Sequence, residues 1–254
     1  MSSAGSNPSS LSQSGGEPRH WHVQPAAELV LPHEQFERES ALLQAAAAGE
    51  LTPQALLWSS GRALITSPAD RRLPHFEAAA RHAAAAGWLV SGRQTGGTAV
   101  ALSPGIVNMS LVLAWHGANP GLEAGYRMLC EPLLQVLERF GIAGDVGPVP
   151  YSLCDGRYNV RVAGRKLAGT SQRQASRVGH GALLLHAGVL VEGDAAQLTA
   201  VVAEFYRRAG DPRDYRPQSL IALQDCVAAD APRSGSLTED FSRELAAVLR
   251  RRPL

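Results

Sequence analysis

The chain has 254 residues, of which 45% are apolar and 19% charged, and its formal net charge at pH 7 is +1. This composition is typical of a globular protein with a sizeable core. The balanced charge predicts neither nucleic acid nor an anionic membrane as a partner. No run of about 18 apolar residues occurs, so we expect no transmembrane helix.

The first 24 residues are rich in serine, glycine and proline and lack the basic start and apolar centre of a signal peptide. We therefore expect a disordered tail over residues 1–24, a single domain over 25–254 that ends in a helical segment, and a cytoplasmic location. The three cysteines, Cys130, Cys154 and Cys226, are far apart, and the histidines form no HExxH motif. Neither a disulfide framework nor a metal site is predicted.

The first half of the chain alternates between helical and strand patterns. Pro74 near the start of one helical run and Gly87 at its end are typical helix boundaries. In chain order we expect a helix over 34–48, two short strands within 54–66, a helix over 73–87, a strand over 88–93, a glycine-rich turn with a short strand, and a strand over 106–115.

The second half begins with the most regular helical pattern, over 121–140, with one apolar face made of Leu122, Tyr126, Leu129, Leu133, Val136 and Phe140. After it we expect a loop over 141–156, a hairpin that turns at "AGR", a strand pair over 179–193, a helix capped by Asp194 and a last helix with a Ser236/Glu239 capping box. The fold class is therefore α+β, with a mixed, largely antiparallel sheet flanked by helices.

Lys166 is the only lysine in the chain, beside 23 arginines. An ammonium is compact and can lose its proton when it is buried, whereas a guanidinium is broad and stays charged. A single lysine in an arginine-rich chain therefore indicates a position that needs a point charge or a proton transfer. Gly164 and Gly169 flank it and would let a ligand or another backbone segment approach closely.

Cys154 lies twelve residues before Lys166, in the loop "YSLCDGRYN". A hairpin could bring the two side chains together, where the ammonium would favour the thiolate and stabilise an oxyanion during acyl transfer. A buried structural thiol is the alternative for Cys154. Cys130 and Cys226 lie in apolar helical patterns, and we expect both to pack in the core.

Two glycine-containing stretches add weaker signals. The pair Gly96–Gly97 in "GRQTGGTAV" could expose backbone N–H groups to a carbonyl or a phosphate. In "GHGALLL", His180 is equally compatible with a ligand contact and with a strand edge, and His186 in the following apolar run is more typical of a structural residue.

Three of these stretches, "RQTGGTAV", "GRKLAGTSQR" and "GHGALLL", resemble in order and spacing the motifs of the biotin/lipoate protein ligase superfamily. The "CDGRYN" run before the motif lysine is similar to the octanoyl-protein amidotransferase branch. Gly92 and Thr98 stand where ATP-using ligases usually have an arginine and a third glycine. The resemblance implies a mixed sheet flanked by helices, and an enzyme that attaches octanoyl or lipoyl groups to a lysine of a carrier domain.

The resemblance implies that Cys154 forms an acyl thioester and that Lys166 contacts the acyl carbonyl. It implies substrate binding by Arg93, Thr95, Gly96, Gly97, Thr98, Ala99, Val100, Asn108, Gly169, Thr170, Ser171, His180, Gly181 and Ala182. We expect Val100, Val107, Met109 and Leu111 to help line an apolar tunnel for the acyl chain.

The implied donor is an acylated carrier, either acyl-carrier protein or the glycine-cleavage H protein, and the implied acceptor is the lipoyl domain of a 2-oxoacid dehydrogenase. This acyltransferase, expected to be a monomer, would need no cofactor and no metal. Two alternatives stay open: a lipoate-protein ligase that uses ATP and Mg²⁺ to make lipoyl-adenylate, and a non-catalytic protein that binds an acylated carrier.

Overall fold

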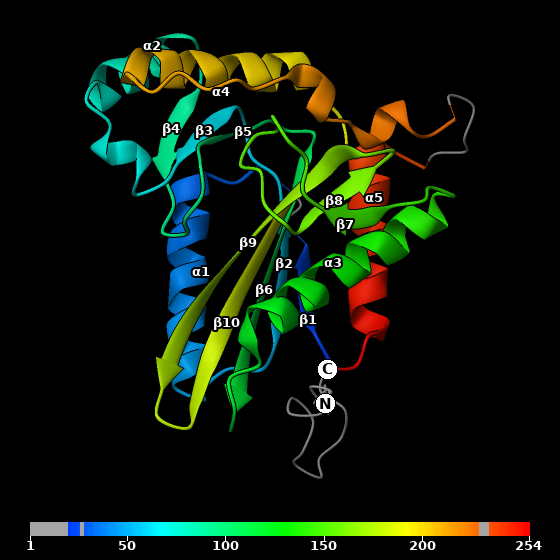
Figure 1. Cartoon of the computed structure of the whole chain (residues 1–254). Helices are drawn as coiled ribbons and strands as arrows, with labels where there is room; N and C mark the ends of the chain where they lie inside the picture. The colour runs from blue at the N-terminus through cyan, green and yellow to red at the C-terminus, as the bar shows by residue number, and fades with distance from the viewer. Residues whose placement is uncertain (1–19, 26–27, 229–233) are drawn as a thin grey trace, which may run out of the picture.

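The computed structural model describes residues 20–25, 28–228 and 234–254. Two sheets and five α-helices make up the fold (Figure 1). The strands are β1 (His22–Pro25), β2 (Gln54–Trp58), β3 (Ala63–Thr66), β4 (Leu89–Gly92), β5 (Val100–Leu102), β6 (Ile106–His116), β7 (Asp145–Gly147), β8 (Asn159–Val162), β9 (Arg165–Arg177) and β10 (His180–Leu190). The helices are α1 (Pro32–Ala47), α2 (Phe76–Ala85), α3 (Gly121–Arg139), α4 (Ala195–Ala209) and α5 (Leu237–Arg251).

The larger sheet has the strand order β1-β2-β6-β10-β9-β8-β7 and is antiparallel except for the β1–β2 pair. The smaller sheet has the order β4-β3-β5. The predicted α+β class with a mixed, largely antiparallel sheet is confirmed. The two short strands predicted within 54–66 are also present, but β2 joins the larger sheet and β3 the smaller one.

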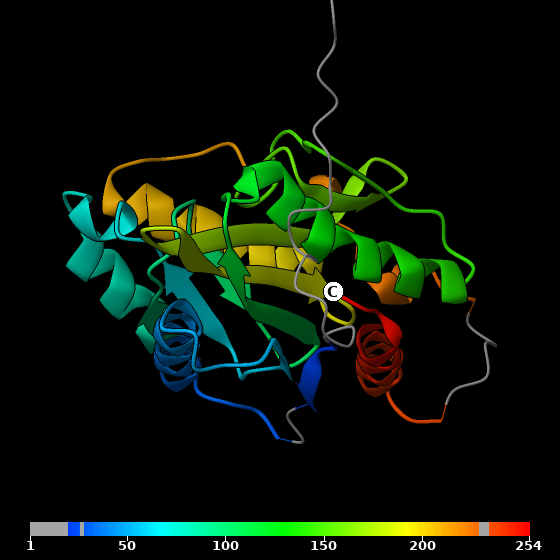
Figure 2. The same ribbon diagram turned by 90° about the horizontal axis from the view of Figure 1, so that it is seen from below.

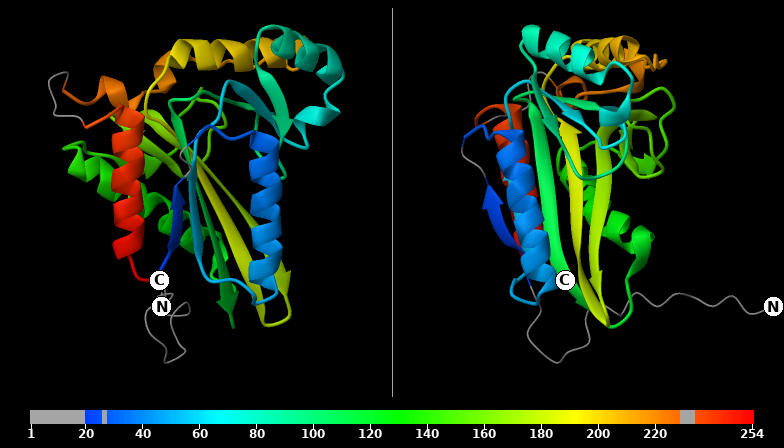
Figure 3. Two further views of the ribbon diagram at one scale, coloured as in Figure 1. Left: turned by 180° about the vertical axis from the view of Figure 1, so that it is seen from behind. Right: turned by 90° about the vertical axis from the view of Figure 1, so that its left-hand side faces the viewer.

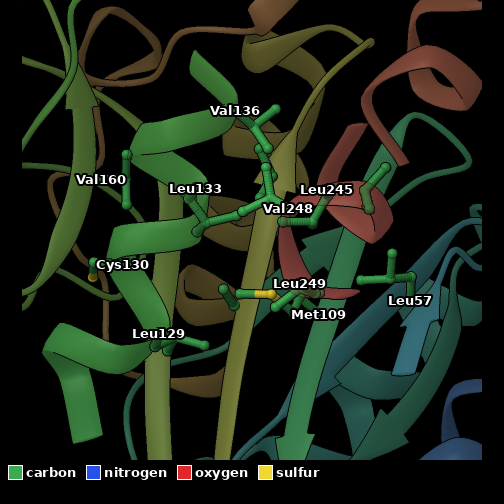
Figure 4. Packing of buried hydrophobic residues seen from close by; sticks show 14 of the residues in the cluster. Leu57, Met109, Leu129, Cys130, Leu133, Val136, Val160, Leu245, Val248 and Leu249 are labelled. Carbon is green, nitrogen blue, oxygen red and sulfur yellow. The ribbon is translucent and has the colours of Figure 1, made fainter. Parts of the chain in front are cut away.

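Helices α3 and α5 cover one face of the larger sheet. Figure 4 shows Leu133 and Val136 of α3 meeting Leu245 and Val248 of α5 above Met109 of β6. Helix α1 packs on the opposite face, along β6 and β10, and α2 and α4 cover the smaller sheet (Figures 1 and 2). This arrangement leaves space for a pocket between α1, the smaller sheet and the strands β6, β10 and β9.

The β8–β9 hairpin turns at Ala163 and Gly164, which have φ angles of 50° and 74°. Positive φ at both central residues is what a tight two-residue hairpin turn requires, so the predicted hairpin is confirmed. Asp194 caps α4 with its carboxylate 2.7 Å from the Ala196 N–H, and the Ser236/Glu239 capping box of α5 is present.

Several local predictions were wrong. Residues 22–24 of the predicted tail lie in β1, which pairs with β2 at the edge of the larger sheet. Residues 1–19 of that tail lie outside the described residues. The segment 179–193 forms one long strand, β10, instead of a strand pair, because all eleven of its residues pair with β6. A short strand, β7, occurs within the predicted loop 141–156. Leu122, in the first turn of α3, is 61% exposed, although its carbonyl accepts a hydrogen bond from Gln172 of β9.

Candidate active site

The backbone around Cys154 is held in a strained conformation by its neighbours. Cys154 has a φ of 51°, in the left-handed region that residues with a side chain seldom adopt. The carboxylate of Asp155 accepts hydrogen bonds from the Val149 N–H at 2.7 Å and from the Asn159 side chain at 3.0 Å. The Asn159 amide also donates to the Gly156 carbonyl at 2.7 Å. The "CDGRYN" run therefore fixes the loop that presents the thiol.

The glycine-rich loop lies against the same thiol. The Thr98 N–H points at the Cys154 Sγ from 3.3 Å, and a Cβ atom on Gly97 would lie only 2.5 Å from that sulfur. Gly97 has a φ of 100°, so glycine is required there both for the backbone angle and for the space. Arg93 closes the loop by donating to the Thr98 carbonyl at 2.7 Å and to the Gly96 carbonyl at 3.1 Å.

Lys166 is 6% exposed, and its ammonium lies beneath the cysteine loop. Nζ donates to the carbonyl oxygens of Leu153 at 2.5 Å and of Cys154 at 3.0 Å. A Cβ atom on Gly169 would be 3.1 Å from Nζ, so this glycine leaves room for the amine. The Lys166 amine therefore lies against the backbone of Cys154, and its charge acts on the Cys154 thiol.

The electrostatics separate Cys154 from the other two thiols. Burial alone would raise the pKa of Cys154, but the charges of Lys166 and Arg93 and the Thr98 N–H together bring it below the ordinary thiol value. Burial raises the pKa of Cys130 to about 12 and also raises that of Cys226. Of the three cysteines, Cys154 alone has surroundings that favour the thiolate relative to an ordinary thiol.

Burial also changes the pKa of the Lys166 amine. Burial lowers the pKa of Lys166 to about 8, although the negative charges of Cys154 and Asp155 partly oppose the shift. An amine with this pKa can both donate and accept a proton near pH 7–8. Arginine could not do so, because a guanidinium stays protonated.

A pocket with a volume of about 150 Å³ extends from this pair along the face of the larger sheet that α1 covers. Seven of the predicted substrate-binding residues line it: Arg93, Thr95, Val100, Asn108, Gly169, Thr170 and Ser171. Gly96, Gly97, Thr98 and Ala99 are not in its wall. Gly97 and Thr98 contact the sulfur instead, and the Ala99 N–H donates to the buried Tyr206 hydroxyl at 2.7 Å.

The structure does not bring His180, Gly181 and Ala182 to the pocket. They lie near the β9–β10 turn, where the His180 ring stacks on His116 at 6.3 Å and Ala182 packs beneath α1. The pocket is reached by β10 residues farther along the strand, including His186, six residues or about 20 Å from His180. The interpretation of His186 as a purely structural residue was therefore incomplete.

Only Val100 of the predicted tunnel residues lines the pocket. Val107, Met109 and Leu111 point to the opposite face of β6 and pack in the core with α3 and α5. Alternate residues of a strand face opposite sides of a sheet, so the pocket receives Ile106 and Asn108 instead. Helix α1 forms a further wall with Phe36, Glu39 and Ser40, a contribution that no local sequence pattern indicated.

The sequence model of the lipoyl protein ligase A/B catalytic domain matches residues 31–234. The chain belongs to this family. Among its relatives are octanoyl-[GcvH]:protein N-octanoyltransferases of Anoxybacillus flavithermus, 26% identical over 77% of this chain and 71% of that protein, and of Geobacillus kaustophilus, 28% identical over 67% and 59%. An uncharacterised protein of Cupriavidus necator is 31% identical over 83% of this chain and 86% of its own length.

Solved structures of lipoate-protein ligases share the family fold. A lipoate-protein ligase A bound with ATP superposes with a TM-score of 0.64 and 17% identity, over 91% of this chain and 85% of that chain. A bi-partite lipoate protein ligase from Thermoplasma acidophilum gives a TM-score of 0.56 and 18% identity, over 91% and 92%. At this identity the likeness establishes the fold and not the reaction.

No helix among the described residues is long and apolar enough to cross a bilayer. In the same part of the chain, His, Cys, Asp and Glu side chains form no group of three or more that could hold a metal ion.

Proposed function

We propose that this protein is an acyltransferase that moves an octanoyl or lipoyl group from a carrier protein to a lysine of a lipoyl domain, through a thioester on Cys154. The observation that carries the proposal is the pairing of Cys154 with the buried Lys166 at the end of the pocket. The names of the N-octanoyltransferase relatives and of a Listeria monocytogenes lipoyl-[GcvH]:protein N-lipoyltransferase, 23% identical, support it. The donor is an acyl-carrier or glycine-cleavage H protein, and the acceptor is a lipoyl domain of a 2-oxoacid dehydrogenase.

In the first step the Cys154 thiolate attacks the carbonyl carbon of the donor thioester. The negative charge that develops on the oxygen is stabilised by the nearby cations and N–H groups. The bond to the carrier sulfur then breaks, and the departing thiolate takes a proton from the Lys166 ammonium. Cys154 now carries the acyl group, and Lys166 is neutral.

In the second step the ε-amine of the acceptor lysine attacks the Cys154 thioester. Neutral Lys166 accepts the proton that this amine loses as the amide bond forms, and the Cys154 thiolate departs. Each step exchanges one acyl bond for another, so the donor thioester supplies the free energy and neither ATP nor a metal is needed. We also propose that residues 25–254 act as one catalytic domain, because α5, beyond the matched segment, packs in the same core as α3.

Intact-mass measurement after incubation with an octanoylated carrier tests this function, with and without ATP and Mg²⁺. We expect one octanoyl adduct without ATP, present in the control variant Cys226→Ala and absent from Cys154→Ala. Unimpaired adduct formation and transfer by Cys154→Ala would refute the thioester. Pyrophosphate release that depends on free octanoate or lipoate would favour the ATP-dependent ligase instead.

A further inference from the structure

The glycine-rich loop between β4 and β5 is held from two sides at one peptide group, the one that joins Thr98 to Ala99. Its carbonyl oxygen accepts a hydrogen bond from the Arg93 guanidinium at 2.7 Å, and its N–H donates to the Tyr206 hydroxyl at 2.7 Å. Because a peptide group is planar, two bonds at its opposite ends fix its orientation. The adjoining Thr98 N–H, which points at the Cys154 Sγ from 3.3 Å, is restricted by the same two bonds.

Tyr206 reaches this loop from a helix that is distant in the sequence. It lies on α4, 107 residues after Ala99, and is fully buried. Helix α4 packs on β5, the strand that follows the loop, and lies beside α2 (Figure 3). The centroid of the Tyr206 ring lies 5.3 Å from that of Phe205 and 5.9 Å from that of Tyr215, and the Arg213 guanidinium lies 4.0 Å from it. These contacts hold the ring, so the hydroxyl can be removed while the ring stays packed.

A buried carboxylate sets the direction of the hydrogen bonds at this hydroxyl. Asp70 is 2% exposed, and its Oδ1 accepts a hydrogen bond from the Tyr206 hydroxyl at 2.5 Å. Its Oδ2 accepts from the Ser67 N–H at 2.7 Å. Because Asp70 takes the only hydrogen of the hydroxyl, the Tyr206 oxygen can only accept from Ala99. Burial and the bond to Asp70 also raise the pKa of Tyr206, so the hydroxyl keeps the proton that it donates.

The Tyr206 hydroxyl acts on the Cys154 thiol only through the loop. The charged and titratable groups that interact with this thiol directly are Lys166, Arg93 and Tyr126. Burial raises the pKa of the thiol, and the Thr98 N–H is among the groups that lower it. Hydrogen bonds weaken steeply as the donor turns away from the acceptor. A loop that turned freely would therefore stabilise the thiolate less than a loop that is held.

We propose that Tyr206 is a positioning residue for the Cys154 thiol. Its hydroxyl, held by Asp70, keeps the glycine-rich loop in the orientation that aims the Thr98 N–H at the sulfur. The inference rests on the proposed function in that it takes Cys154 as the nucleophile. It predicts that the loss of one hydroxyl group on α4 changes the reactivity of a thiol that this hydroxyl does not touch.

The substitution Tyr206→Phe in the full chain tests the inference, because it removes the hydroxyl and keeps the ring. The readout is the rate of Cys154 alkylation by iodoacetamide as a function of pH, which requires no acyl transfer. We expect the midpoint of this profile to rise by about 0.5–1 pH unit, as partial loss of one hydrogen bond to a charged group would give. An unchanged midpoint in a folded Tyr206→Phe variant would overturn the inference, even if the variant unfolded at a lower urea concentration.

The matched control is Tyr215→Phe, which removes a hydroxyl from the neighbouring ring of the same cluster. In the part of the chain that the structure describes, no hydrogen bond joins the Tyr215 hydroxyl to the glycine-rich loop. The control should keep the wild-type midpoint. An equal shift in both variants would mean that the midpoint follows the packing of the cluster, and it would overturn the inference.

Asp70→Asn tests the group behind the hydroxyl and serves as a second variant if Tyr206→Phe does not fold. An amide has one acceptor atom where a carboxylate has two, so it cannot accept from both the Ser67 N–H and the Tyr206 hydroxyl. The midpoint should rise, as in Tyr206→Phe. A folded Asp70→Asn variant with the wild-type midpoint would overturn the role given to Asp70.

Acylation by the N-acetylcysteamine thioester of octanoate separates this inference from the proposed function. At saturating donor the rate of acyl-enzyme formation should fall by about threefold to tenfold in Tyr206→Phe, with KM unchanged because Tyr206 does not line the pocket. A higher KM with an unchanged rate at saturation would assign Tyr206 to donor binding and overturn the inference. If the donor failed to acylate the wild type, the proposed function would be refuted, and a shifted alkylation midpoint would still support the positioning role of Tyr206.

Discussion

Replacement of Lys166 by methionine tests the electrostatic basis of the site. Methionine has a similar length and no charge, so the substitution removes the cation that most lowers the pKa of Cys154 while the sulfur stays buried. Burial of the sulfur then raises the pKa of Cys154, opposed by the charge of Arg93 and by hydrogen bonds from Thr98. We expect the thiol of the variant to titrate at a higher pH than that of the wild type.

The size of the effect follows from the geometry. An opposite charge this close to an ionisable group shifts its pKa by about 1–3 units, and each unit changes the thiolate fraction about tenfold when the pH lies below the pKa. The Lys166 Nζ donates a hydrogen bond to the backbone carbonyl of Cys154 at 3.0 Å, so its charge lies close to the residue that carries the sulfur. Thiolate reactivity at pH 7 should therefore fall by at least about tenfold.

The assay is the rate of Cys154 alkylation by iodoacetamide between pH 5 and pH 10, with the alkylated cysteine identified by peptide mass. The wild-type rate should rise with pH to a plateau, and the midpoint of this rise should lie below the ordinary thiol pKa. For Lys166→Met the midpoint of the rise should lie above the ordinary thiol pKa. The matched control is Arg165→Met at the neighbouring position, because the charge of Arg165 acts on Cys226. Identical midpoints for wild type and Lys166→Met, in a variant that is folded by circular dichroism, would refute the electrostatic pairing.

Three further predictions concern the glycine-rich loop beside Cys154, the loop that carries Cys154, and the amine of Lys166. Gly97→Ala places a Cβ atom 2.5 Å from the Cys154 sulfur and should slow acyl-enzyme formation by about a hundredfold. The control Gly61→Ala, at a position with open space around it, should form the acyl-enzyme at the wild-type rate. Equal rates for the two variants would contradict the close contact between Gly97 and the sulfur. Asp155→Ala leaves buried donors unpaired and should lower the free energy of unfolding in urea by about 1–3 kcal/mol; an unchanged midpoint would mean that the carboxylate does not hold the loop. Because the pKa of Lys166 falls from 10.5 to about 8 on folding, the unfolded chain binds more protons between these values, so stability should rise with pH from about 8 to 10. That rise in the free energy of unfolding should be smaller in Lys166→Met. If urea unfolding showed the same increase between pH 8 and pH 10 in both proteins, the low pKa of the buried Lys166 amine would be contradicted.

The elements predicted from local patterns were mostly confirmed, and the failures have a common cause. Hydrophobic periodicity identified α3, but it also placed Leu122 on the buried face, whereas this side chain is 61% exposed in the structure. The run 179–193 was predicted to be a strand pair, yet pairing of residues 180–190 with β6 keeps β10 continuous. Long-range pairing is decided by a partner that is distant in the sequence, and a local pattern does not contain that information.

The sequence alone determined which residues to consider for chemistry: the single lysine, the cysteine in a polar loop and the glycine pair. These signals are local, because residue type and backbone freedom are properties of the position itself. The tertiary structure decided which of them meet. It brings Cys154, Lys166 and Gly97 together, leaves His180 about 20 Å along β10 from His186, and places Glu39 of α1 in the pocket wall. Strand register and helix packing set these distances, because they fix which face each side chain occupies.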